Sequence, residues 1–260
     1  MATLISGAEL ARALALAPPP LLFECRNTFV GDEEAQAGYA TAGHIPSAAF
    51  LEGGVSLAEP DAPFGNTRPT DAAALGASLG GLGIRSADDF IVLYGRGPSE
   101  GESLGARVAS GMMWATRCWW VLRSWGFTRV AILDGGVDRW VADGRAVVTG
   151  SQAHPPTTFD TASLTNIADM AASKEDVLAR VAAIESGDDS VVLLDSLPTS
   201  SYEGTGPTTA GRRAGHITGA VSLPYGTLFS PDTGLFKQEA ELRQAFADVG
   251  ITQGVPILAY

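Results

Sequence analysis

The sequence is poor in cysteine, in basic residues and in long apolar runs, and each shortage excludes a class of protein. Cys25 and Cys118 are its two cysteines, too few for a disulfide framework, so we expect a reduced, cytoplasmic setting. No apolar run reaches the roughly 18 residues of a membrane-spanning helix. The 29 acidic residues outnumber the 17 basic ones and give a net charge of −12. This charge argues against nucleic acid or an anionic membrane as a partner, but not against a small anionic substrate.

Familiar metal-binding and catalytic motifs are missing as well. None of the three histidines stands at zinc-ligand spacing from a cysteine or an acidic residue, and no zinc-protease or serine-hydrolase motif occurs. We therefore expect no metal and no cofactor. The Gly-rich stretch 95–105 lacks the Gly-Lys-Ser/Thr of a Walker loop. It fits either an anion cradle made of backbone N–H groups or a flexible surface insert.

The chain does contain an internal repeat, the feature that most strongly constrains its organisation. Four stretches recur in the same order, 166 to 172 residues further along the chain. The pairs are Leu21–Glu24 with Val192–Asp195, Gly43–Ala48 with Gly215–Ala220, Leu82–Ile84 with Val249–Ile251, and Asp89–Tyr94 with Val255–Tyr260. Four matches at nearly one offset indicate a tandem duplication.

Short apolar runs alternate with helical patterns throughout, which predicts an α/β protein whose sheets are mostly parallel and flanked by helices. We expect a first domain over 1–148, a linker over 149–165 and a second domain over 166–260. The predicted strands are 21–25, 48–51, 90–94, 129–133, 190–194, 220–223 and 255–260. The predicted helices are 7–16, 72–82, 110–125, 137–142, 174–186 and 237–249, and the polar stretches 27–41 and 198–213 are predicted loops.

The second copy is expected to be incomplete. The first copy continues past Tyr94 with a helix, a strand and a second helix, and the second copy has no counterpart of these after Tyr260. Without them the apolar edge of its sheet would be exposed. We therefore expect the natural chain to be longer by roughly 40 to 50 residues.

A few side chains are candidates for chemistry. His44 and His216 stand in equivalent turns of both copies, which favours a structural role in bonding the turn backbone. Cys25, beside Arg26, is either a reactive thiol or an ordinary buried one, and the buried reading is favoured, as it is for Cys118 among apolar and aromatic residues. Adjacent basic residues such as Arg212 and Arg213, just before the second turn, suit an anion or a solvated surface equally well.

Taken together, these stretches resemble tandem-domain rhodaneses, that is, thiosulfate or 3-mercaptopyruvate sulfurtransferases. The likeness spans nearly the whole chain. It rests on four sets of residues: Gly43–Ala48 with its copy Gly215–Ala220, Arg117–Arg123 with Trp125–Phe127, Val130–Gly136 with Trp140, and the closing run Gly250–Tyr260.

The resemblance implies that the second copy is catalytic and that a nucleophilic cysteine follows Tyr260 immediately, outside these residues. That cysteine would open a loop whose N–H groups lower the pKa of its thiol. The thiolate would take a sulfane sulfur from the donor as a persulfide and pass it to a thiol or cyanide. The first copy carries Gly95 at this position and is expected to be inactive.

The sequence departs from the family pattern at the donor site. Many members have an arginine two residues after the second-copy aspartate, where this chain has Leu197 after Asp195 and Ser196. A basic residue further along is also missing at 200–202, and 65–69 lacks a histidine that some mercaptopyruvate enzymes have. We hypothesise that Arg212 and Arg213 replace the lost guanidinium. A catalytically inactive rhodanese-like binding or regulatory protein is the alternative, and a phosphatase or arsenate reductase on the same fold is a third reading.

Overall fold

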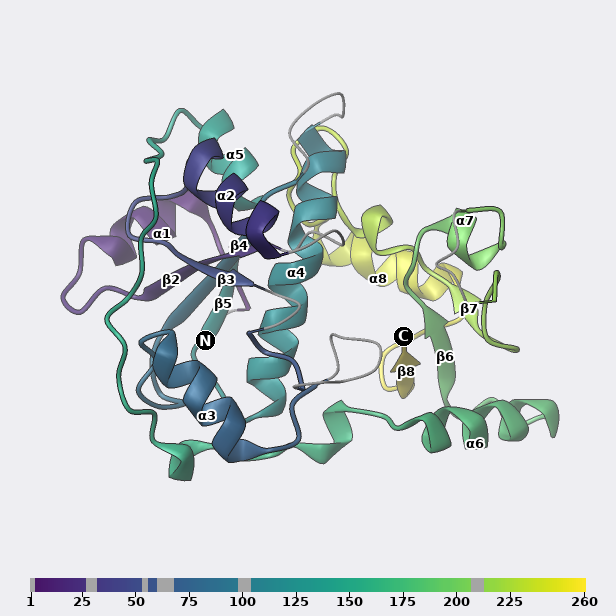
Figure 1. Ribbon diagram of the computed structural model, residues 1–260. Helices are drawn as coiled ribbons and strands as arrows, with labels where there is room; N and C mark the ends of the chain where they lie inside the picture. Colours follow the sequence, from purple (N-terminus) through teal and green to yellow (C-terminus); the bar gives the residue numbers. More distant parts are fainter. Residues whose placement is uncertain (1–2, 27–31, 53–55, 60–67, 98–103, 207–212) are drawn as a thin grey trace. The chain divides into compact units, whose positions relative to one another are not determined.

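The computed structural model describes residues 3–26, 32–52, 56–59, 68–97, 104–206 and 213–260 (Figure 1). The chain divides into two compact units. The first unit is Met1–Met170 with Pro231–Leu235, and the second is Ala171–Ser230 with Phe236–Tyr260. Each unit has its own sheet and is described by itself.

The first unit is built on a five-stranded sheet in the order β1-β5-β4-β2-β3, in which every strand pairing is parallel. Its strands are β1 (Leu4–Ile5), β2 (Leu21–Arg26), β3 (Ala49–Glu52), β4 (Ile91–Gly95) and β5 (Val130–Leu133). The centre of the sheet is β4 with β2, and its buried apolar side chains account for their strand signal in the sequence. Because the strands are parallel, the residues that follow β2 and β4 meet at one edge of the sheet.

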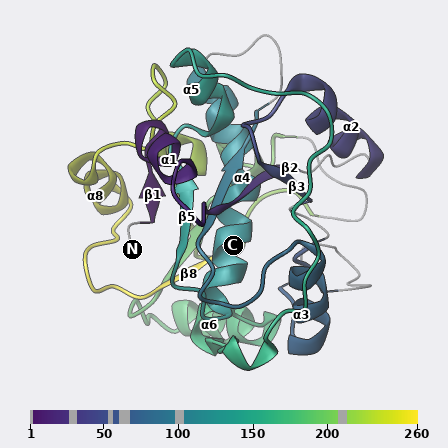
Figure 2. The same cartoon turned by 90° about the vertical axis from the view of Figure 1, so that its left-hand side faces the viewer.

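Helices cover both faces of this sheet, as predicted. They are α1 (Gly7–Leu14), α2 (Asp32–Ala42), α3 (Ala72–Gly81), α4 (Leu104–Ser124) and α5 (Gly136–Ala142). On one face Leu10 of α1 and Trp140 of α5 belong to one buried cluster with Leu22, Val92 and Tyr94 of the strands. On the other face α4 runs along the sheet (Figure 2), and Asp71 caps α3 by accepting the N–H groups of residues 73 and 74.

The second unit has a three-stranded parallel sheet in the order β7-β6-β8. Its strands are β6 (Val192–Asp195), β7 (Val221–Ser222) and β8 (Ile257–Ala259), and its helices are α6 (Lys174–Glu185), α7 (Thr199–Tyr202) and α8 (Glu239–Asp248). Leu194, Leu223 and Ile251 form its small buried core. No helix in the described part of the chain is both long and apolar enough to cross a bilayer.

The two units repeat one arrangement, which confirms the duplication predicted from the sequence. The order β7-β6-β8 reproduces the order β3-β2-β4 of the first unit. The helices α1 and α6 begin with matching capping boxes, Ser6 with Glu9 and Ser173 with Asp176. The helices α3 and α8 end in the same turn, where Gly83 and Gly250 have φ angles of 81° and 82°. In the first unit α4, β5 and α5 follow β4, and the described residues of the second unit include no counterpart of them.

Two predicted loops were wrong in part. Residues 27–41 were predicted to be irregular, but α2 covers Asp32–Ala42, because alanine, glutamate and glutamine favour a helix and the buried Tyr39 fixes it to the sheet. The stretch 198–213 contains the short helix α7. The long helix α4 begins at Leu104 rather than near 110, so it includes the last residues of the Gly-rich stretch.

Candidate functional site

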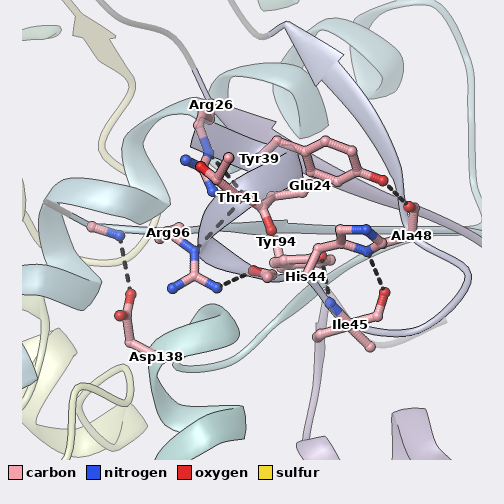
Figure 3. Close-up of polar contacts among 12 residues, drawn as sticks. Glu24, Arg26, Tyr39, Thr41, His44, Ile45, Ala48, Tyr94, Arg96 and Asp138 are labelled. Carbon is pink, nitrogen blue, oxygen red and sulfur yellow. Dashed lines mark hydrogen bonds and ion pairs between the residues drawn. The ribbon is translucent and has the colours of Figure 1, made fainter. Parts of the chain in front are cut away.

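Each unit places a tyrosine where its central strand ends at the carboxyl edge of the sheet. Tyr94 follows β4 residues 91–93, and Tyr260 comes directly after β8. The Tyr94 hydroxyl accepts the backbone N–H of Ile45 at 3.1 Å, and the Tyr260 hydroxyl accepts that of Ile217 at 2.9 Å. The repeated Gly-His-Ile turn is therefore fastened to the strand end in both units (Figure 3).

A second tyrosine in each unit holds the histidine of this turn. Tyr39 stacks on His44 with ring centroids 4.3 Å apart, and Tyr202 stacks on His216 at 3.7 Å. The Tyr39 hydroxyl donates to Ala48 O at 2.5 Å, and the Tyr202 hydroxyl donates to Ala220 O at 2.8 Å. These tyrosines escaped the sequence comparison because Tyr39 lies five residues before its histidine and Tyr202 lies 14 before its own.

Both histidines bond to the backbone, so the predicted structural role is confirmed. His44 is buried, with Nδ1 3.1 Å from Ile45 O and Nε2 2.8 Å from Gly150 O. His216 is exposed, with Nδ1 2.8 Å from Tyr202 O. In both rings a backbone carbonyl takes up hydrogen-bonding capacity that proton transfer to a substrate would need.

A buried carboxylate lies beside each strand-end tyrosine, and the two units neutralise it differently. Glu24 at the end of β2 is paired with Arg26, whose Nε lies 2.8 Å away, and with Arg96, whose Nε lies 3.9 Å away (Figure 3). Its counterpart Asp195 accepts a backbone N–H, that of Leu197, at 2.8 Å. The second unit therefore has no guanidinium bound to this carboxylate among its described residues.

The strand-end tyrosines are held as neutral phenols. Burial raises the pKa of Tyr260 to about 12, and the neighbouring Asp195 carboxylate adds to this rise while the Ile217 N–H opposes it. Burial, followed by the Glu24 charge, raises the pKa of Tyr94 well above the usual value. Each tyrosine is thus an uncharged structural support for the strand end at neutral pH.

The first unit closes its strand end with backbone. A Cβ atom on Gly95 would collide with the carbonyl oxygen of Gly111 in α4, and one on Gly136 would lie 2.6 Å from Gly95 O. The next N–H, that of Gly97, donates to the Asp138 carboxylate at 3.0 Å, and the Arg96 guanidinium donates to Gly43 O (Figure 3). A side chain cannot be accommodated at position 95 without displacing α4.

The anion cradle considered for the stretch 95–105 finds no support at its start, because the Gly97 N–H already bonds to a carboxylate. Residues 98–103 of the stretch lie outside the described residues.

The second unit fixes the backbone of Tyr260 from two sides. Its N–H donates to Leu194 O at 3.0 Å, and its carbonyl accepts the Ser196 backbone N–H at 3.3 Å and the Ser196 hydroxyl at 3.0 Å. The peptide group at this end of β8 is therefore held in one orientation at the carboxyl edge of the sheet. The sequence did not indicate a role for Ser196, because its partner is a backbone carbonyl.

Neither cysteine is placed to act as a nucleophile. Cys25 and Cys118 are free and fully buried, on β2 and on α4. Burial, followed by the neighbouring Cys118, raises the pKa of the Cys25 thiol well above its ordinary value. The prediction that both are buried core thiols is confirmed.

The arginine pair proposed for anion binding is described in part. Arg212 lies outside the described residues, and Arg213 is exposed, three residues before His216. Within the described part of the chain, no three or more histidine, cysteine, aspartate or glutamate side chains come together as a metal site would require.

Comparisons with known proteins agree with this geometry. A model of the rhodanese-like domain matches residues 7–143. The thiosulfate sulfurtransferase of Gallus gallus is 28% identical over 216 residues, which cover 83% of this chain and 66% of that protein. The sulfur carrier protein TtuD of Thermus thermophilus is 29% identical over 185 residues, covering 69% of this chain and 58% of the carrier. The chain thus spans about two thirds or less of the length of these relatives.

Solved structures share the fold over nearly the whole chain. SseA from Escherichia coli, described as a 3-mercaptopyruvate sulfotransferase, superposes with a TM-score of 0.74 at 22% identity, covering 100% of this chain and 88% of that one. Tum1 from Saccharomyces cerevisiae gives a TM-score of 0.74 at 19% identity, covering 98% of this chain and 82% of that one. At these identities the likeness establishes the architecture.

Proposed function

Because the chain belongs to the rhodanese-like domain family, we propose that it is part of a sulfurtransferase whose second unit carries a sulfane sulfur on a cysteine directly after Tyr260. The observation that carries this proposal is the contrast between the two strand ends. Gly95 packs backbone against backbone and excludes a side chain, whereas Tyr260 presents a fixed peptide group at the equivalent edge. The first unit then serves as the non-catalytic copy.

The chemistry of the proposed site follows from its position. A thiol at the carboxyl edge of a parallel sheet, in a loop whose N–H groups point inward, has a lowered pKa and is a thiolate at neutral pH. The thiolate attacks the sulfane sulfur of the donor and forms a persulfide. Thiosulfate then leaves as sulfite, and 3-mercaptopyruvate leaves as pyruvate. An acceptor thiolate or cyanide next attacks the outer sulfur and regenerates the cysteine thiolate, so the cycle is ping-pong and needs no cofactor.

The donor is an anion, and we propose that Arg212 and Arg213 help to bind it. Leu197 stands where many relatives supply an arginine, so another cation is needed near the site. Replacing both arginines with alanine is expected to raise the donor KM by about tenfold and to leave kcat much less affected. Arg139→Ala, in the first unit, is the matched control and should leave both constants unchanged. An unchanged donor KM in the double variant would remove this role.

The experiment that tests the function uses the product of the complete reading frame. It is assayed for sulfur transfer from thiosulfate to cyanide and from 3-mercaptopyruvate to a thiol, beside a variant with serine in place of the cysteine after Tyr260. We expect turnover with at least one donor, and its loss in the serine variant. The free thiols of Cys25 and Cys118 and the net charge of −12 support a cytoplasmic protein that uses small sulfur donors rather than nucleic acid or membrane.

A second function is favoured by one specific observation. Asp195 is followed by Ser196 and by the exposed Leu197, so the second unit lacks the guanidinium that would attract an anionic donor to this strand end. A catalytically inactive rhodanese-like binding or regulatory protein would have no need of it. Absence of turnover with both donors, in a product that folds and contains the cysteine, would establish this alternative.

A further inference from the structure

A cleft of about 570 Å³ lies in the second unit, between α8 and the segment that leads into β8. Its volume is within the usual range for binding sites. The lining is mostly apolar and includes Leu242, Phe246, Ile251, Val255 and Ile257, with Arg243 among its polar members. Ile257 is 43% exposed, so a large apolar side chain of the central sheet lies in contact with solvent at this cleft.

The first unit shows what occupies the equivalent groove. There α3 and the turn after it correspond to α8 and its turn, with Gly80 matching Ala247 and Arg85 matching Thr252. The interdomain linker runs along this groove in extended form. Thr157 N donates to Gly80 O at 2.9 Å, and Asp160 N donates to Arg85 O at 2.7 Å. A polypeptide segment thus binds to the carbonyl groups at the end of α3.

An aromatic side chain anchors this segment. Phe159 is only 7% exposed and stacks on Phe127 at 6.1 Å between ring centroids. One of its ring atoms lies 3.5 Å from the place where a Cβ of Gly76 would be. The occupant of the first groove is therefore an extended peptide with a buried aromatic ring beside the helix.

The second cleft differs at the two positions of closest approach. A Cβ on Gly76 would lie 2.5 Å from Thr161 Cγ2, and one on Gly80 would lie 2.5 Å from Thr157 O. The corresponding residues of α8 are Arg243 and Ala247, so an occupant of the second cleft must lie further from the helix axis. The open volume of the cleft leaves room for such a placement.

Arg243 also supplies a surface for an aromatic ring. Its Nε and Nη2 lie 2.9 and 2.7 Å from Oε1 of Glu239, which holds the guanidinium on the cleft side of α8. The chain places arginines over aromatic rings elsewhere, for example Arg68 over Trp125 at 4.8 Å and Arg145 over Trp140 at 5.0 Å. An aromatic ring on Arg243 would gain the same interaction and would cover Ile257.

We propose that the cleft between α8 and β8 binds an extended peptide segment of a partner protein, with an aromatic side chain seated against Arg243 and Ile257. The backbone of the segment bonds to carbonyl groups at the end of α8, as the linker does at the end of α3. The proposal does not depend on sulfur transfer, because the cleft is built from residues apart from the strand end.

The test uses a labelled synthetic peptide with the sequence of residues 153–165, titrated with the 260-residue chain and followed by fluorescence anisotropy. We expect saturable binding, and about tenfold weaker binding for the peptide with alanine in place of Phe159. Ala247→Arg fills the cleft and Ile257→Lys makes its floor polar, so each should weaken binding by about tenfold or more. Leu178→Lys, at an exposed apolar position on α6 of the same unit, is the matched control and should bind as the parent chain does.

Three results would overturn the proposal. The first is the absence of saturable binding. The second is equal weakening by Leu178→Lys and Ala247→Arg, which would place the peptide elsewhere. The third is a dimer in sedimentation velocity that Ala247→Arg dissociates, because a second copy of the chain would then occupy the cleft. Far-ultraviolet circular dichroism of each variant separates a lost binding site from a lost fold.

Discussion

The two units build the same tyrosine–histidine turn but surround it differently. In the first unit Tyr94 and His44 are buried, Glu24 is paired with two arginines, and Gly95 packs against α4. In the second unit His216 is exposed and Asp195 accepts a backbone N–H. Since the turn persists beside a strand end that admits no side chain, the turn is scaffold. The chemistry must then depend on the residue that follows the second strand.

The largest effect is expected from giving the first unit the side chain that it excludes. Gly95→Cys would drive Cβ into the Gly111 carbonyl of α4, and both partners are backbone, so the clash is relieved only by moving the helix. We expect a loss of about 3 kcal/mol or more in the free energy of unfolding. All five tryptophans lie in the first unit, so urea unfolding followed by tryptophan fluorescence reports on it directly.

Gly81→Ala is the matched control for Gly95→Cys. A Cβ at position 81 meets nothing within 4 Å, and alanine favours the helix over glycine by up to about 1 kcal/mol. A Gly95→Cys protein as stable as the parent would contradict the sealed strand end, and with it the assignment of the first unit as the non-catalytic copy.

The next effect sharpens the comparison between the groove of the first unit and the cleft of the second. Gly80→Ala places a methyl group 2.5 Å from Thr157 O, so we expect the linker to be displaced at a cost of about 1–3 kcal/mol, although helix propensity alone predicts stabilisation. Ala247→Gly, the reciprocal change, should cost about 1 kcal/mol or less, from helix propensity alone.

Hydrogen exchange measured by mass spectrometry distinguishes these cases. Linker residues 157–163 should lose protection in Gly80→Ala and keep it in Ala247→Gly. Unchanged linker protection in Gly80→Ala would mean that the groove of the first unit is not closely packed, and the template for the cleft proposal would be lost.

A smaller difference is expected between the strand-end tyrosines. Tyr94→Phe leaves the N–H of the fully buried Ile45 without its acceptor, at an expected cost of about 1–3 kcal/mol. Tyr260→Phe removes the same bond from the partly exposed Ile217, where water can replace the hydroxyl, and should cost less than about 1 kcal/mol. Thermal unfolding of both variants checks the order. Equal costs would mean that burial does not distinguish the two turns.

The smallest effect is a pH dependence confined to the first unit. Burial lowers the pKa of His154, although its hydrogen bond to Leu22 O at 3.1 Å opposes this. The folded state therefore favours neutral His154. Its contribution to stability is present above the unfolded pKa of about 6.5 and is lost as the pH falls through the lower folded pKa.

His154→Gln should remove part of the destabilisation between neutral pH and pH 5, by at most about 1.4 kcal/mol per pH unit. His216→Gln, at an exposed position in the second unit, is the control and should leave the pH profile of tryptophan-detected unfolding unchanged. Identical profiles for the parent and His154→Gln would show that His154 does not couple to folding.

Much of the fold could be read from the sequence, because its central strands are continuous apolar runs. The runs at 21–25 and 90–94 are buried on both faces of a parallel sheet, and Asp71 signals the start of α3 by itself. The helix α2 was missed because its residues are mostly polar and its stability comes from one buried tyrosine, Tyr39. A contact of that kind is tertiary and leaves no periodic pattern.

The candidate site was predictable at its strand ends and not around them. The repeat aligned Tyr94 with Tyr260, and the structure gives both the same hydrogen bond. The stacking of Tyr202 on His216 and the pairing of Arg96 with Glu24 join residues at unrelated spacings in the chain. Such contacts depend on how loops return to the sheet edge, which local sequence does not specify.

The most direct test of sulfur transfer by the second unit is intact and peptide mass spectrometry of the full reading-frame product after incubation with thiosulfate or 3-mercaptopyruvate. The account predicts a gain of one sulfur atom, removed by cyanide and located on the residue that follows Tyr260. A residue other than cysteine at that position, or a folded product that gains no sulfur there with either donor, would contradict it.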